Sequence, residues 1–128
     1  MDEKIIHFTD LVAWKDGHKL VLDIYKLVER FPKKEQFGLS SQIERAAVSI
    51  TSNIAEGFSR YYFKDKIRFY YMARGSVSEV QNLLIIAKDL HYTGDKLSDE
   101  LIERSNRAQA LINGLINSIS KQSGKNSV

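Results

Sequence analysis

The stretch that decides the fold is Ser49-Ile50-Thr51-Ser52-Asn53-Ile54-Ala55-Glu56-Gly57. Its apolar residues recur three and four positions apart, which is the spacing of one face of an α-helix. Beside that face runs a line of polar residues that have short side chains and carry no charge until Glu56. A plain solvent-facing side would favour lysine and other long charged residues, so this line indicates close packing or a functional site.

The same apolar spacing extends the stretch into a helix over about 39–58. Ser40 or Ser41 can cap its start, and Glu44 stands where the partner of a Ser41 capping box belongs. Gly57 suits a left-handed C-terminal cap. The stretch is therefore the second half of a complete amphipathic helix.

Three further segments show the helical period, over about 10–30, 65–90 and 97–119. Asp10 can cap the first of them, and Pro32 stops it because proline disfavours the helical conformation in the residue before it. Gly75 lies inside the third helix, where glycine costs about 1 kcal/mol relative to alanine, so we expect another backbone close to it. Short connectors imply antiparallel neighbours, and the sequence predicts an all-α, up-down-up-down four-helix bundle.

Length and composition indicate one domain. The chain has 128 residues, and we expect a flexible arm over 1–8 and a flexible polar tail over 120–128. It has no cysteine, which excludes disulfides, thiolate metal sites and cysteine nucleophiles. The start lacks the pattern of a signal peptide and no run is long enough to span a membrane, so we expect a cytoplasmic protein.

The polar line on the second helix has two readings beyond a solvated face. It can be a buried hydrogen-bond network that holds the second and third helices in register, with Arg45 meeting an acid such as Glu79. It can instead form a ligand, nucleic-acid or catalytic site, although no nucleophile, metal ligand or oxyanion donor lies near it in sequence. We favour the structural network, whose residues are Gln42, Arg45, Ser49, Asn53, Glu56 and Glu79.

The segment between residues 60 and 74 has five basic residues, one acidic residue and several aromatic ones. Basic side chains neutralise phosphates and aromatic rings stack on unpaired bases, so it is the best candidate for nucleic-acid binding. The alternative is that its rings belong to the core or to a subunit contact and its cations are merely solvated. The candidate residues are Arg60, Tyr61, Lys64, Lys66, Arg68 and Arg74.

Motifs of catalysis are absent from the sequence. His7, His18 and His91 are scattered without metal-ligand spacing, and there is no glycine-rich phosphate loop and no nucleophile elbow. We therefore expect no metal, no cofactor and no enzymatic activity.

Four motifs lie between residues 8 and 79, and the resemblance that they carry covers about 8–120, nearly the whole chain. They are Phe8-x-x-Leu11-x-x-Trp14-Lys15, Phe31-Pro32-x-x-Glu35-x-Phe37-Gly38-Leu39-x-x-Gln42-Ile43, Arg45-Ala46-Ala47-x-Ser49-Ile50-x-Ser52-Asn53-Ile54-Ala55-Glu56-Gly57 and Ala73-Arg74-Gly75-Ser76-Val77-x-Glu79. With them the chain resembles a bacterial family of four-helix bundles first noticed as proteins encoded within intervening sequences of 23S ribosomal RNA genes. Phe37 replaces a usual tyrosine and Arg74 stands where a neutral residue is common.

That resemblance implies ring-shaped homo-oligomers, reported as pentamers. It also implies a relation to the accessory protein of diversity-generating retroelements, which binds a reverse transcriptase and nucleic acid. We expect a non-enzymatic homo-oligomeric bundle that binds RNA, DNA or a ribonucleoprotein. The alternative is a protein-interaction scaffold without nucleic-acid contact.

Overall fold

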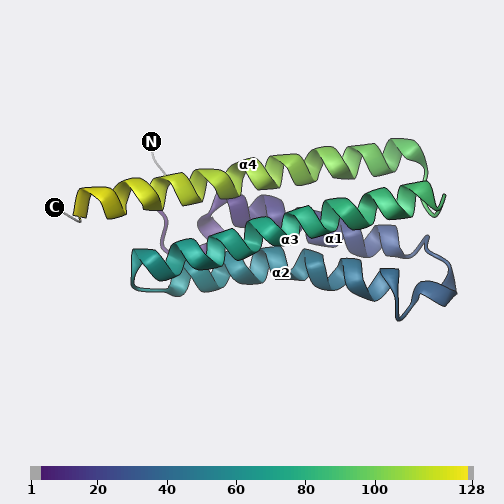
Figure 1. The fold of residues 1–128 in the computed structure, drawn as a ribbon, viewed down its shortest axis with the longest axis horizontal. Helices are drawn as coiled ribbons and strands as arrows, with labels where there is room; N and C mark the ends of the chain where they lie inside the picture. Colours follow the sequence, from purple (N-terminus) through teal and green to yellow (C-terminus); the bar gives the residue numbers. More distant parts are fainter. Residues whose placement is uncertain (1–3, 127–128) are drawn as a thin grey trace.

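Four helices account for most of the structure. The computed structural model describes residues 4–126, in which α1 (Val12–Val28), α2 (Leu39–Ser59), α3 (Phe63–Asp89) and α4 (Asp95–Asn126) follow in chain order. Two short 3-10 turns, η1 (Phe8–Asp10) and η2 (Lys33–Glu35), precede α1 and α2. The helices lie side by side, and the α1–α2 and α3–α4 connectors meet at the end opposite the α2–α3 connector (Figure 1). The predicted all-α, up-down-up-down four-helix bundle is confirmed.

Each helix contacts its neighbours in the chain, and α1 also contacts α4, which closes the bundle. The core lies between the four apolar faces. It includes fully buried aliphatic side chains from every helix, among them Ile24, Ile43, Ile50, Ile54, Leu84 and Ile112. The apolar residues spaced three and four apart are therefore those that the bundle buries.

The predicted helix caps were mostly wrong. Asp10 does not cap α1; its carboxylate accepts from the backbone N–H groups of Ile6 and His7, both at 3.0 Å. Neither Ser40 nor Ser41 caps α2, because both lie inside the helix, whose N-cap residue is Gly38; Glu35 Oε1 accepts from the Leu39 N–H at 3.2 Å. Both carboxylates belong to the 3-10 turns that precede the helices. Through Asp10, residues 6 and 7 at the end of the predicted flexible arm are bonded to η1. Residues 1–3 of that arm lie outside the described residues.

The ends of the helices also differ from the prediction. Gly57 is an interior residue of α2, which continues to Ser59, and the left-handed residue that follows α3 is His91, with φ at 61°. The predicted end of the last helix at residue 119 was wrong, because α4 continues to Asn126. Polar residues such as Ser120 and Gln122 do not break a helix, and each added residue gains one backbone hydrogen bond. Residues 127–128 of the predicted tail lie outside the described part.

Candidate functional site

The polar line of α2 lies on the surface of the bundle and not in its interior. Asn53 Nδ2 donates to the backbone oxygen of Ser49 at 2.8 Å and to its Oγ at 3.0 Å. Ser76 on α3 donates to the same Oγ at 2.9 Å. Ser49 and Asn53 are half-buried, so this short chain of hydrogen bonds links α2 to α3 at the edge of their contact.

The other members of the predicted network are not buried. Gln42, Arg45 and Glu79 line a groove of about 520 Å³ on the α2–α3 face, and no ion pair joins Arg45 to Glu79. The prediction that they form a buried network was therefore wrong. Because long side chains at the edge of a helix contact reach water at little cost, they have no need of a buried partner.

At Gly57, α2 and α3 are in close contact. A Cβ atom at this position would lie 2.6 Å from Tyr70 Cε1, which is closer than two carbon atoms can come. The Tyr70 ring is buried, and burial raises its pKa to about 12. For Gly75 a close backbone was predicted, but a Cβ atom at that position would have nothing within 4 Å, so the prediction was wrong.

Lys66, one of the six predicted nucleic-acid ligands, has a structural role. Its Nζ donates to the backbone oxygen of Phe58 at 2.7 Å and of Gly57 at 3.4 Å, and it lies 5.4 Å from the Phe58 ring centroid. Partial burial lowers its pKa. The bond to Phe58 satisfies a carbonyl group at the end of α2, whereas the Gly57 oxygen also accepts from the Arg60 N–H at 3.3 Å. Lys66 therefore stabilises the turn, and its ammonium group is partly engaged by these bonds.

Arg74 is also held by its own chain. Its guanidinium donates to Asn113 Oδ1 on α4 at 3.1 Å and lies 4.7 Å from the centroid of the Tyr71 ring. The side chain is half-buried. This contact ties α3 to α4 and leaves Arg74 a minor part of any basic surface.

Arg60 and Arg68 share one aromatic ring. Their guanidinium carbons lie 4.6 Å and 5.2 Å from the centroid of Phe69. Arg60 also donates to Glu56 on the preceding turn at 3.2 Å, so Glu56 serves this pair and not the predicted polar network. Two positive groups are thus brought together from α3 and from the end of α2.

Tyr61 and Lys64 are exposed beside that pair. Tyr61 and its neighbour Tyr62 are 85% and 67% exposed, and their rings meet edge to face at 5.0 Å. Of the six predicted ligands, Arg60, Tyr61, Lys64 and Arg68 therefore lie open to solvent around the α2–α3 connector. We call these four residues, with Tyr62, the connector patch.

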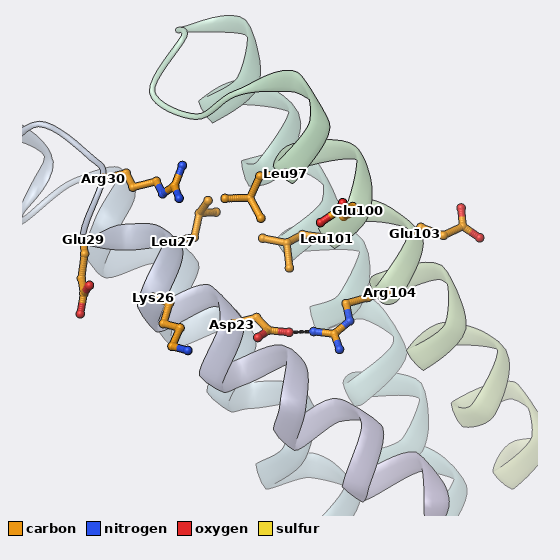
Figure 2. A pocket seen from close by; sticks show the side chains of 10 residues that line it. All are labelled: Asp23, Lys26, Leu27, Glu29, Arg30, Leu97, Glu100, Leu101, Glu103 and Arg104. Carbon is orange, nitrogen blue, oxygen red and sulfur yellow. Dashed lines mark ion pairs between the residues drawn. The ribbon is translucent and has the colours of Figure 1, made fainter.

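A second surface feature lies at the opposite end, between α1 and α4. This groove of about 930 Å³ has Leu27, Leu97 and Leu101 at its base and charged side chains along its rims. Figure 2 shows the ion pair between Asp23 and Arg104 crossing the groove from one helix to the other. The sequence does not predict this groove, because its width depends on the distance between α1 and α4.

In the described part of the chain, no three His, Asp or Glu side chains gather as a metal site would require. Among the helices described, none is long and apolar enough to cross a membrane.

The family model of the 23S rRNA-intervening sequence protein matches residues 9–114. The chain belongs to this family. A solved structure from Bacteroides thetaiotaomicron, described as a protein of unknown function from the S23 ribosomal protein family, is similar with a TM-score of 0.76. The two are 21% identical over 82% of this chain and 98% of that one, which supports the shared fold alone. Among curated proteins, none matches the chain.

Two aromatic residues near the exposed cations were not among the residues predicted from the sequence. Phe69 is half-buried, and both Arg60 and Arg68 lie against its ring. Tyr62 was not singled out, although its exposure nearly matches that of Tyr61. The dense alternation of aromatic and basic residues between 58 and 71 was the available signal for both.

Proposed function

We propose that this member of the family is a non-enzymatic, homo-oligomeric helical bundle in the cytoplasm that binds nucleic acid, free or within a ribonucleoprotein, through the connector patch. The observation that carries the proposal is the gathering of free cations and open aromatic rings at one end of the bundle. Lys64 and Arg68 are exposed, and no acidic side chain of the described residues pairs with either. Cations of this kind neutralise phosphates and release counterions from the nucleic acid.

Self-association is supported by the outer face of α3. Five large apolar side chains on it are between 39% and 51% exposed: Tyr71, Met72, Ile85, Ile86 and Leu90. Apolar surface of this extent on a soluble chain is typical of a contact with another protein. We propose a ring of five copies, the stoichiometry that the family resemblance implies. Such a ring multiplies the formal charge of +3 fivefold and sets several connector patches side by side.

The nucleic-acid proposal is tested by fluorescence anisotropy with labelled RNA and DNA, measured from about 50 to 200 mM salt. The variant Arg60→Gln/Lys64→Gln/Arg68→Gln should lower the salt dependence of log K by about 2, because each lost phosphate contact removes about 0.7 on a single strand. The matched control is Lys26→Gln/Lys33→Gln/Lys34→Gln, which removes three exposed cations from the end of α1 and from η2, next to the α1–α2 connector. Absence of binding at low salt, or an equal effect of both variants, would contradict the proposal.

The oligomer is tested by size-exclusion chromatography with light scattering. Met72→Glu/Ile85→Glu should dissociate the ring, whereas Val12→Glu, at an apolar residue of α1 that is 55% exposed, should leave it intact. A monomeric parent chain at micromolar concentration would rule the ring out.

The second candidate is a protein-interaction scaffold. It is favoured by Phe37, which is 90% exposed and stands beside the groove lined by Arg45 and Glu79. Lone aromatic and arginine side chains of this kind often anchor protein interfaces. If nucleic acid does not bind at low salt, this candidate becomes the better one.

A further inference from the structure

The connector patch offers two aromatic rings that the fold does not use. Tyr61 and Tyr62 lie between α2 and α3, and they belong to no buried cluster. Their edge-to-face contact at 5.0 Å fixes each ring against the other while most of both rings stays in water. Such rings are available to stack on a flat partner without any rearrangement of the core.

A phosphate can be held next to these rings. Arg60 and Arg68 both lie close to the Phe69 ring, at 4.6 Å and 5.2 Å from its centroid, and the electron-rich faces of an aromatic ring attract guanidinium groups. Arg60 gives one hydrogen bond to Glu56, and Arg68 gives none to an acid of the described residues. Each guanidinium has five N–H donors, so several remain for the oxygens of a phosphate.

The engaged cations limit what the patch can bind. Lys66 bonds to the end of α2, and Arg74 bonds to Asn113. Of the basic residues between 60 and 74, Arg60, Lys64 and Arg68 therefore remain to contact a ligand. Three cations span few phosphates, which is a small footprint for a duplex. Paired bases also keep their faces inside the helical stack, where a protein ring cannot reach them.

We propose that the connector patch binds unpaired nucleotides, in single-stranded RNA or DNA, with bases stacked on Tyr61 and Tyr62 and a phosphate held by Arg60 and Arg68. This inference rests on the proposed function, because it names the class of nucleic acid that the same surface takes. Every base has an aromatic face, so the patch should show little sequence preference.

The test compares one labelled single strand, as RNA and as DNA, with a duplex of the same sequence. The parent chain should bind the single strand more tightly. Tyr61→Ala/Tyr62→Ala should weaken single-strand binding by at least about tenfold, since stacking on one ring alone has roughly that effect, and should leave duplex binding unchanged. Tyr61→Phe/Tyr62→Phe is the matched control, because it keeps both rings and should keep the affinity.

Folding does not confound the result, since both rings are exposed; circular dichroism of each variant checks this. Equal affinity for single strand and duplex, or an equal loss on both, overturns the inference while the proposed function stands. Loss in the phenylalanine variant shows that the hydroxyl groups act and overturns stacking. Absence of binding to both forms overturns the proposed function itself and leaves the patch to a protein partner.

Discussion

The contact between α2 and α3 and the contact between α1 and α4 use the same kinds of sequence pattern but differ in closeness. At the first, Gly57 lets the Tyr70 ring touch the backbone of α2, and Ser49 bonds across to Ser76. At the second, a groove of about 930 Å³ separates the helices. Small residues at the first contact let two backbones approach, and no equivalent small residue lines the groove of the second.

The side chains that close each contact differ accordingly. Alanine and valine side chains of α2 and α3, such as Ala47, Ala73 and Val77, are fully buried. Across the α1–α4 contact, the links are ion pairs at the surface, Asp23 with Arg104 and Asp16 with Arg107, the latter at 3.1 Å. Exposed pairs contribute at most about 1 kcal/mol each. The contact between α2 and α3 therefore contributes most to the stability of the bundle, and the contact between α1 and α4 contributes least.

The largest effect should come from cutting apolar volume on the two sides. Ile50 is fully buried, and Ile50→Ala should lower the free energy of unfolding by about 4 kcal/mol. Leu101 is as large and 3% exposed, but it lines the α1–α4 groove, so Leu101→Ala should cost only about 2 kcal/mol because the space opens onto solvent. Urea unfolding at one fixed protein concentration measures both. Equal losses of unfolding free energy would show that the α1–α4 contact is as tightly packed as the core.

Gly57 and Gly75 should respond to alanine with opposite signs. Gly57→Ala should destabilise by about 2 kcal/mol, since the added methyl group meets the rigid Tyr70 ring and outweighs the better helix propensity of alanine. Gly75→Ala should stabilise by up to about 1 kcal/mol, because nothing lies within 4 Å of its new Cβ. Thermal and urea unfolding read out both signs. If Gly57→Ala were neutral, α2 and α3 would not owe their closeness to this glycine.

These two glycines show how far the sequence could lead. Apolar spacing along each segment predicts the four helices and their buried faces, because burial follows helical periodicity wherever the helix packs. It cannot tell which glycine meets another helix, since that depends on where the partner's large side chain falls. For this reason the predicted helix cap at Gly57 and the predicted close contact at Gly75 were both wrong.

The candidate site has the same limit. Counting cations between residues 60 and 74 located the connector patch, because composition does not depend on the fold. It could not show that Lys66 caps α2 or that Arg74 reaches Asn113, which lies in another helix. Contacts between side chains far apart in sequence, or across a turn of unknown shape, decide which charges stay free.

The smallest effect concerns Glu35, which links the two connectors at the end where the α1–α4 groove lies. Tyr92 Oη donates to its Oε2 at 2.8 Å, and this bond, together with the Leu39 N–H, holds the pKa of Glu35 below its usual value. The unfolded chain then binds protons more readily than the folded one, so the stabilisation is present above the ordinary pKa of about 4.5 and is lost as pH falls through the lower folded value.

Glu35→Gln keeps the shape and removes the titration, so it should make the loss of stability below about pH 5 shallower while slightly lowering stability at neutral pH. Tyr92→Phe should act in the same direction, because it removes the largest cause of the lowered pKa. Urea midpoints collected from pH 7 down to about 3 measure the slopes. Gln36→Asn, at an exposed neutral residue next to η2, is the control and should leave the slope as it is, because it removes no titrating group. If both test variants kept the slope of the parent chain, the charge of Glu35 would not hold the connectors together. The contact between the rings of Phe31 and Tyr92, whose centroids lie 5.7 Å apart, would then hold them.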